Sequence, residues 1–456
     1  MVSGGSRASG HTVSVIVVGA GNRGEQYAAY SKLRPSALKI VAVAEPVPER
    51  RLRFARQYAI PDNMVFSSWE DALSRPQMAD GCVIATQDTL HVEPAVAAME
   101  RGYHVLLEKP MALTEKKCRT IAGASKKTGM TLNICHVLRY TDFFSRVKEI
   151  IDRGALGNIY SIYHAENVPY YHMAHSYVRG NWRNSRESSP MILAKCCHDL
   201  DLIYWFAGSS PSSIASFGGL HHFTPANAPE GAPERCTDGC PAADECPYEA
   251  VRTYLHGIPL KIGMTKTDSR ITSLGAGFLL KFPRVASMVP GLRPFANWRG
   301  WPVSTITEDL SVEGIMNALR SGPYGRCVYR CDNDQVDHQA TAIEFENGIT
   351  AMLNMHGHAE EECRTLRIDG SLATLRGKYG GGGRLEVHIH RTGKKIIVPV
   401  KTDLMGHTEG DVGIMENFVK VLRGGKGLTT ANDSLQSHLM AFAAHRSRVR
   451  GEVVRF

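Results

Sequence analysis

Continuous apolar segments alternate with amphipathic segments in the first third of the chain, and this alternation restricts the fold most strongly. The apolar segments are rich in β-branched residues and cover residues 12–19, 38–46, 81–87, 103–110 and 130–138. Strands without a polar face are typical of a parallel sheet that helices cover on both sides. The alternation therefore predicts a doubly wound α/β domain at residues 12–135.

Beyond residue 136, single apolar and polar residues alternate instead. This pattern occurs in residues 159–168, 339–358, 364–377 and 385–400. It is typical of antiparallel strands with one buried face. The sequence thus predicts a C-terminal α+β domain over residues 136–456, with a large, mostly antiparallel open sheet. One face of such a sheet is free to meet another subunit, so we expect a homodimer or homotetramer.

Two segments depart from both patterns. Residues 219–300 are rich in Gly, Pro and Cys and show little periodicity, so we expect a long insertion in the second domain. Residues 1–11 are expected to form a disordered tail. No apolar run is long enough for a membrane span, and no apolar segment resembles a secretory signal, so we expect a cytoplasmic protein.

The charge of the chain argues against some partners. The formal net charge is +8, and lysine and arginine residues are spread along the chain without a basic block. Nucleic acid is therefore not expected as a partner. A membrane is not expected either, because no apolar run has the length of a span. A small anionic ligand remains compatible with this charge. The odd number of cysteines, 11, fits mostly free thiols in a reducing compartment.

The first apolar segment ends in a glycine-rich turn, residues 19–24, and a helical pattern follows it. Glycines with G-x-G-x-x-G spacing in this setting are typical of a Rossmann dinucleotide-binding turn. The alternative is a tight turn that binds nothing. Glu45 ends the second apolar segment, where an acid bonds a ribose 2′-hydroxyl and repels a 2′-phosphate. We therefore expect NAD, although the adjacent Arg50 and Arg51 could accommodate the phosphate of NADP.

The element Glu108-Lys109-Pro110 ends a later apolar segment, at the sheet edge where open α/β proteins bind ligands. A lysine held at such an edge can exchange a proton with a substrate hydroxyl. A surface lysine before a turn proline is the alternative interpretation.

Four elements in this order and spacing resemble the Gfo/Idh/MocA oxidoreductases: the glycine turn, residues 85–91 (ATQDTLH), Glu108-Lys109-Pro110, and residues 197–201 (CHDLD). The resemblance covers nearly the whole chain. It implies a Rossmann domain that binds NAD(P), a C-terminal α/β domain, and hydride transfer at a carbon of a sugar or cyclitol. It also implies that the C-terminal domain binds the substrate, that Lys109 and His198 carry the proton chemistry, and that Asp201 supports or contacts the substrate.

The cofactor contacts predicted on this basis are Gly19, Gly21, Asn22, Arg23, Gly24, Glu45, Thr86, His91, Glu108 and Lys109.

His198 has an alternative interpretation as a buried structural histidine. Asp201 lies one helical turn after it and could orient its ring. One departure from the family matters, because many members carry an aspartate four residues before this histidine. This chain has Ala194 there, followed by Lys195, which joins the candidate substrate contacts.

Residues 164–184 bring aromatic rings, imidazoles and a guanidinium into one stretch. Such groups suit a polyol ring that carries hydroxyls or a carboxylate. A well-packed aromatic loop or a metal site would give the same composition. The candidate substrate contacts are Tyr171, His172, His175, Arg179 and Trp182.

Cys236, Cys240 and Cys246 lie close together in the insertion, with Cys327 or Cys331 as a possible fourth ligand. Three thiolates and a distant fourth could hold a structural zinc ion. The spacing is not the paired C-x2-C pattern, so free thiols or a disulfide remain alternatives.

The sequence favours an NAD(P)-dependent oxidoreductase that transfers a hydride between nicotinamide and a hydroxyl-bearing carbon of a sugar, sugar acid or cyclitol. One alternative is an NAD-dependent glycoside hydrolase, in which a transient ketone allows elimination at the neighbouring carbon. Another is a sensor or scaffold that binds the dinucleotide without catalysis.

Overall fold

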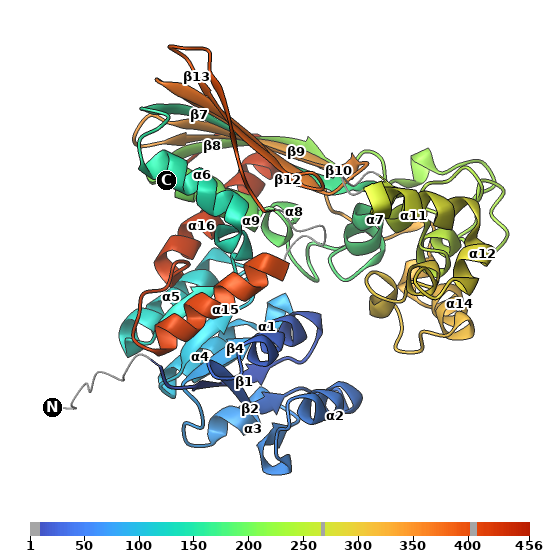
Figure 1. Ribbon diagram of the computed structural model, residues 1–456, viewed down its shortest axis with the longest axis horizontal. Helices are drawn as coiled ribbons and strands as arrows, with labels where there is room; N and C mark the ends of the chain where they lie inside the picture. The colour runs from blue at the N-terminus through green and yellow to red at the C-terminus, as the bar shows by residue number, and fades with distance from the viewer. Residues whose placement is uncertain (1–9, 266–269, 402–407) are drawn as a thin grey trace. The chain divides into compact units, whose positions relative to one another are not determined.

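The computed structural model describes residues 10–265, 270–401 and 408–456, so most of the tail predicted at residues 1–11 lies outside the described residues (Figure 1). The chain forms two compact units that interleave along the sequence. Unit 1 contains residues 1–153, 193–211 and 405–443, and unit 2 contains residues 154–192, 212–404 and 444–456. The domain boundary predicted at residue 136 divides the chain differently. A single cut in the sequence cannot assign later segments of the chain to the first unit, although some of them belong to it.

Unit 1 is built on a six-stranded sheet in the order β3-β2-β1-β4-β5-β6. All neighbouring strands pair in parallel, so the sheet is doubly wound as the sequence predicts. The strands are β1 (Val13–Val18), β2 (Leu38–Ala44), β3 (Val65–Phe66), β4 (Gly81–Ile84), β5 (His104–Leu107) and β6 (Leu132–Ile134).

Helices connect these strands. They are α1 (Asn22–Leu33), α2 (Pro48–Gln57), α3 (Trp69–Ser74), α4 (Val92–Glu100) and α5 (Glu115–Thr128), with short 3₁₀ turns η1 (Asp62–Met64) and η2 (Asp88–Leu90). Local signals fix their ends. For example, the Thr114 hydroxyl accepts a hydrogen bond from the Lys117 amide at the start of α5, and Gly129 ends that helix with a φ of +73°.

Both faces of the parallel sheet are buried. Alternate side chains of β1 enter two apolar clusters, with Val15 and Val17 in one and Ile16 and Val18 in the other. The first cluster also contains residues of α15 (Thr408–Leu422), a helix that returns from the far end of the chain and packs beside α1 (Figure 1). A late segment thus completes the core of the first sheet.

The remaining elements of unit 1 follow β6 or return to the unit later in the chain. They are η3 (Val137–Tyr140), α6 (Asp142–Asp152), α9 (Cys197–Ala207) and the first part of α16 (Ala431–Arg450). The short helix α8 (Met191–Ala194) precedes α9.

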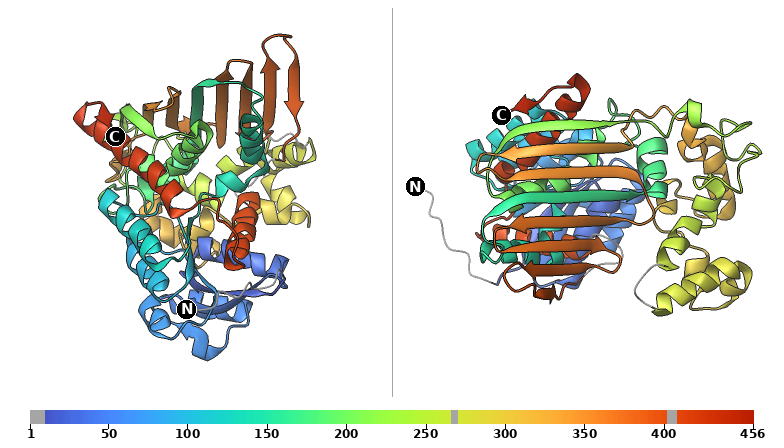
Figure 2. Two further views of the ribbon diagram at one scale, coloured as in Figure 1. Left: turned by 90° about the vertical axis from the view of Figure 1, so that its left-hand side faces the viewer. Right: turned by 90° about the horizontal axis from the view of Figure 1, so that it is seen from above.

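Unit 2 is built on a nine-stranded sheet in the order β14-β13-β12-β11-β7-β10-β9-β8-β15 (Figure 2, right). Only the central pair of β7 and β10 is parallel among the pairs with a described register. The strands are β7 (Ile159–Pro169), β8 (Pro211–Gly219), β9 (His338–Phe345), β10 (Thr350–Ala359), β11 (Cys363–Gly370), β12 (Ala373–Gly380), β13 (Arg384–Ile389), β14 (Lys395–Val398) and β15 (Val454–Arg455).

Along these strands, the alternation of apolar and polar residues matches the alternation of buried and exposed side chains. On β10, Ala351, Leu353 and Met355 are buried, whereas Met352 and Asn354 are not. This confirms the predicted mostly antiparallel sheet with one buried face.

The segment predicted as a long insertion, residues 219–300, carries helices in its second half, although its sequence shows little periodicity. The helices of unit 2 outside the sheet are α7 (Tyr170–Met173), the π-helical η4 (Ala174–Arg179) and η6 (Val251–Leu255), α10 (Ile258–Thr265), α11 (Arg270–Lys281), α12 (Pro283–Met288), α13 (Arg293–Ala296) and α14 (Val312–Ser321). Short 3₁₀ turns are η5 (Pro225–Asn227), η7 (Val303–Thr305), η8 (Pro323–Gly325) and η9 (Val328–Arg330). None of the helices in the described ranges has the length and apolar content of a membrane span.

Candidate functional site

The glycine turn lies between β1 and α1, and its glycines are needed for different reasons. Gly19 has a φ of +92°, and a Cβ there would come within 2.6 Å of the Ala85 carbonyl oxygen. A Cβ on Gly24 would lie 2.0 Å from the Gly19 carbonyl oxygen. A Cβ on Gly21 would meet nothing within 4 Å, and no side chain caps α1 at this residue. The amino end of α1 is therefore open for an anionic group to approach.

Glu45 follows β2 and is almost fully buried. Its carboxylate accepts hydrogen bonds from the amides of Ala20 (2.8 Å) and Val47 (3.0 Å). The side chain thus fixes the glycine turn, and its oxygens retain further acceptor capacity for a hydroxyl. Arg51 donates to the backbone carbonyls of Glu45 (2.6 Å) and Pro46 (3.1 Å).

Arg23 lies within the glycine turn but is directed into the unit. Its guanidinium pairs with Glu108 at 2.6 Å and with both oxygens of Asp411 at 2.6 and 3.1 Å. The Tyr27 hydroxyl donates to the same Glu108 oxygen at 2.6 Å. Burial alone would raise the pKa of the Glu108 carboxyl, but the charges of Arg23 and Lys109 outweigh it and lower this pKa. The described contacts of Arg23 thus tie α1 to the end of β5 and to α15.

His91 is completely buried after β4. Its Nδ1 lies 2.7 Å from the Pro110 carbonyl oxygen, and its Nε2 lies 3.2 Å from that of Thr86. The Thr86 hydroxyl donates to the Leu90 carbonyl at 3.0 Å. His91 therefore joins the loop after β4 to the segment after β5, so that both loops form one edge of the sheet.

Lys109 follows β5 at this edge. Its Nζ donates to the carbonyl oxygen of Ala194 at 2.9 Å. Ala194 is the last residue of α8, where a helix leaves carbonyl groups without partners. At the position where the family resemblance leads us to expect an aspartate, this chain thus offers Lys109 a backbone oxygen.

His198 and Asp201 lie one turn apart on α9, and both are buried. Arg139 donates to both oxygens of Asp201, at 2.6 and 2.7 Å, in a bidentate ion pair. Burial raises the pKa of the Asp201 carboxyl, and Arg139 partly counteracts this. The carboxylate of Asp201 is thus already paired with the guanidinium of Arg139 inside unit 1. Lys195, another candidate substrate contact, is also buried in this unit.

Sequence reasoning missed two further histidines beside His198. The ring centroid of His136 lies 5.7 Å from those of both His198 and His438. The His136 Nε2 is 3.7 Å from Asp201. Burial and the nearby charge of Arg139 hold the pKa of His136 well below its usual value.

His438, on α16, supports the segment that follows Lys109. Its Nε2 accepts a hydrogen bond from the Met111 amide at 2.8 Å, so its Nδ1, 2.6 Å from the Ser434 carbonyl, is the donor. Burial lowers the pKa of His438 to about 3, which agrees with a neutral ring that accepts at Nε2. No local spacing could have indicated His438, because it lies in a distant part of the sequence.

The aromatic stretch predicted to bind substrate lies in unit 2, and its members differ. His175 and Arg179 are buried, and burial lowers the pKa of His175 to about 3. His175 contacts the Tyr254 hydroxyl at 3.0 Å, and Arg179 donates to two backbone carbonyls. Both therefore have internal partners, as expected of a packed loop. Tyr171, His172 and Trp182 are half-buried, and the Nδ1 of His172 lies 2.9 Å from a carboxylate oxygen of Glu362.

The cysteine cluster is arranged around Arg179. The Cys236 sulfur lies 3.4 Å from the Arg179 guanidinium, and the thiols of Cys240 and Cys246 line the same small cavity. All are free thiols. Within the described ranges, no three His, Cys, Asp or Glu side chains form a group that could hold a metal ion. The predicted zinc site is therefore not confirmed, because the sulfurs border a buried guanidinium without converging on one point.

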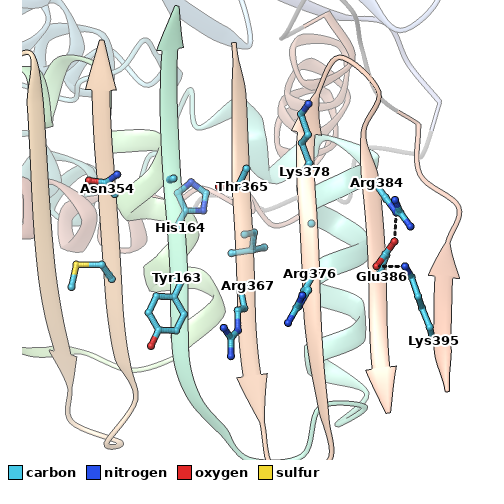
Figure 3. Close-up of a pocket in the computed structure, with 14 residues that line it drawn as sticks. Tyr163, His164, Asn354, Thr365, Arg367, Arg376, Lys378, Arg384, Glu386 and Lys395 are labelled. Atoms are coloured by element: carbon cyan, nitrogen blue, oxygen red, sulfur yellow. Dashed lines mark ion pairs between the residues drawn. The ribbon is translucent and has the colours of Figure 1, made fainter. Parts of the chain in front are cut away.

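The exposed face of the nine-stranded sheet carries a shallow hollow of about 550 Å³ (Figure 3). Tyr163, Met352 and Asn354 line it on the central strands β7 and β10. Arg367, Arg376, Lys378, Arg384, Glu386 and Lys395 line it on β11 to β14, and Glu386 pairs with Arg384 and Lys395. The lining of the hollow on β11 to β14 is therefore mainly basic.

Two family models match the chain. The N-terminal one, described as "Oxidoreductase family, NAD-binding Rossmann fold", matches residues 13–136, and the C-terminal one, described as "Oxidoreductase family, C-terminal alpha/beta domain", matches residues 148–274. Together they cover more than half of the chain.

Curated relatives resemble part of the chain. A 2,7-anhydro-N-acetylneuraminate hydratase of Escherichia coli is 29% identical over 210 residues, which are 46% of this chain and 54% of the relative. An inositol 2-dehydrogenase of Salmonella paratyphi B is 25% identical over 208 residues, 44% of this chain and 57% of the relative. The chain thus spans about half the length of these relatives.

A solved structure has the same fold along almost the whole chain. It is an oxidoreductase from Agrobacterium radiobacter in complex with NAD+, L-tartaric acid and magnesium, with a TM-score of 0.65, 13% identity and coverage of 97% of this chain and 98% of that chain.

Proposed function

Because this chain belongs to the Gfo/Idh/MocA oxidoreductase family, we propose that it is an NAD(P)-dependent dehydrogenase of a sugar, sugar acid or cyclitol. The observation that carries this proposal is the sheet edge of unit 1. There Lys109 and the open amino end of α1 occupy the carboxyl ends of parallel strands, where open α/β sheets bind ligands.

The residues at this edge fit a dinucleotide. The amides at the start of α1 would hold the pyrophosphate, which needs the free space found beside Gly21. Glu45 would accept a hydrogen bond from the ribose, which favours NAD over NADP. When bound, the nicotinamide accepts or returns the hydride. The remaining predicted contacts, such as Thr86 and His91, would shape the edge around it.

Lys109 and His198 would exchange the proton of the substrate hydroxyl. Because Ala194 supplies only a carbonyl, the ammonium of Lys109 is oriented by a neutral oxygen instead of a carboxylate. Tyr171, His172 and Trp182 stay candidate substrate contacts, since their side chains are only half-buried. The buried pair of Arg139 and Asp201 would instead hold α9, and with it His198, in place.

The test is turnover of the full-length protein with NAD+ and a panel of sugars, uronates and cyclitols, followed by the absorbance of the reduced cofactor. Lys109→Met should lower kcat by about 100-fold or more, the usual size of a lost acid–base group. The matched control is Lys117→Met, an exposed lysine on α5. Unchanged kcat in Lys109→Met would contradict the assigned role of this lysine.

The second candidate function is the NAD-dependent glycoside hydrolase, which works by elimination from a transient ketone. The likeness to the 2,7-anhydro-N-acetylneuraminate hydratase favours it. In this reaction a hydride would first pass from the sugar to the nicotinamide. The resulting ketone would acidify the neighbouring C–H, so that its proton and the leaving oxygen are eliminated. Water would then add, and the hydride would return to the sugar. Conversion of a glycoside or anhydro sugar without net NADH would distinguish it from the dehydrogenase. Binding of NAD without any turnover would instead indicate the sensor or scaffold.

The open sheet is proposed to join two subunits. A twofold axis parallel to the strands would place the basic residues of β11 to β14 opposite the partner's β8 and β9. Glu344 lies exposed on β9 and would offer a counter-charge there. Tyr163 and Met352, on the central strands, would then form the apolar middle of the interface.

A further inference from the structure

Helices α10 to α13 form a small lobe of unit 2 that exposes large apolar side chains. Each helix of this lobe packs against the next one in sequence. The exposed fraction is 86% for Ile271, 76% for Leu274 and 81% for Met288. Phe278, Phe282, Val285, Val289 and Phe295 are exposed as well. Exposed apolar groups in this number mark an interaction surface.

The exposed residues of α11 share one face of the helix. Ile271, Leu274 and Phe278 are three and four residues apart, which places them in one stripe. Ala276 and Leu279 are buried, and they occupy the opposite side of the helix. The exposed stripe is therefore a second apolar face, additional to the one that holds the lobe together.

The charges of the lobe are mainly positive. In the sequence, residues 257–306 contain seven lysines and arginines and one acidic residue, Asp268. Arg270 and Lys281 lie at the two ends of α11, and Arg284 and Arg293 follow on α12 and α13. These four side chains are exposed together with the apolar residues. The surface thus combines apolar side chains with a net positive charge.

We propose that this lobe docks onto an anionic lipid surface. An interfacial helix buries its apolar face at the boundary between headgroups and acyl chains while lysine and arginine meet the headgroups. The exposed residues of α11 and α12 are mainly aliphatic or phenylalanine, which suits a fluid boundary that needs no directional hydrogen bonds. The proposal is independent of the proposed catalytic function.

The test is flotation of the full-length protein with vesicles of phosphatidylcholine, with or without phosphatidylserine. The wild type should float with the vesicles that contain phosphatidylserine and detach as salt increases. Leu274→Ser/Met288→Ser should weaken binding at least tenfold. Arg270→Gln/Lys281→Gln/Arg284→Gln should abolish the preference for phosphatidylserine. The matched control, Leu33→Ser/Leu52→Ser, removes two exposed leucines of unit 1 and should bind like the wild type.

Two results would overturn the proposal. One is a wild type that floats with neither vesicle type. The other is equal binding by the apolar variant and the wild type, provided that thermal melting shows all variants folded. The lobe could instead bind a second copy of the chain, and light scattering tests this alternative. A lower mass of Leu274→Ser/Met288→Ser than of the wild type in solution would assign the lobe to that second copy.

Discussion

Arg139 and Asp201 form a buried ion pair beside the proposed site, and their geometry sets what each residue can do. Two donor atoms of Arg139 meet the two oxygens of Asp201 in a pair with almost no solvent exposure. A carboxylate held in this way is poorly placed to bind a substrate hydroxyl as well. Asp201 lies three residues after His198 on α9, so its ion pair with Arg139 supports this helix.

Arg139→Met should therefore destabilise unit 1 strongly. The change leaves Asp201 buried without its counter-ion, so we expect the free energy of unfolding to fall by about 3–5 kcal/mol. Urea denaturation measures this value. Arg139→Met/Asp201→Leu is the informative partner variant, because loss of both charges should recover much of the stability. A single variant as stable as the wild type would contradict the prediction.

The neutral buried histidines predict how stability depends on pH. Burial lowers the pKa of both His175 and His438 to about 3, whereas the usual value is 6.5. The unfolded chain therefore binds protons that the folded chain excludes. Their contribution is present in full above pH 6.5 and declines as the pH falls toward 3, by at most about 1.4 kcal/mol per pH unit for each ring.

Urea denaturation between pH 7 and pH 5 checks this slope. His438→Gln keeps an acceptor for the Met111 amide but removes the titrating ring. Its free energy of unfolding should change less with pH than that of the wild type. Equal slopes for the two proteins would show that His438 does not titrate in this way.

At the level of single residues, the sequence predicts what depends on local context. Gly19 and Gly24 stand in a strand–turn–helix pattern that can be recognised without any distant residue. The partner of Arg23 is different, because Asp411 lies 388 residues away and no spacing rule connects the two. For the same reason the sequence does not indicate the role of His438, whose ring accepts a hydrogen bond from the amide of Met111, 327 residues away. The assigned roles of Lys109 and His198 remain predictions.

At the level of elements, the strands of both sheets follow from their hydrophobic patterns, whereas the helix that covers a given sheet does not. An amphipathic pattern predicts that α15 has an apolar face, but the pattern does not say which sheet that face covers. In the structure, Ile414, Met415 and Phe418 of α15 join the apolar cluster on the parallel sheet of unit 1.

Phe418→Ala tests this contribution of α15. The ring is fully buried against the first sheet, so its loss should cost about 3–5 kcal/mol of stability. Val449→Ala, at an exposed position of α16, is the control and should have almost no effect. The midpoint of thermal unfolding compares the two variants. A small effect of Phe418→Ala would indicate that α15 contributes little to the core of unit 1.

At the level of the whole molecule, the exposed face of the nine-stranded sheet predicts the state of association. Tyr163 lies near the middle of the sheet, and the basic residues lie toward β14 (Figure 3). Met352 is the register partner of Tyr163 on the neighbouring strand β10. In the proposed pairing, Met352 lies near the twofold axis, so a charge there would meet the same charge of the partner. Met352→Arg should therefore convert a dimer into monomers, and light scattering should report half the mass. Leu372→Arg, in the exposed turn between β11 and β12, adds the same charge away from the axis and should leave the mass unchanged. A monomeric wild type, or a dimer that persists in Met352→Arg, would contradict pairing through this face.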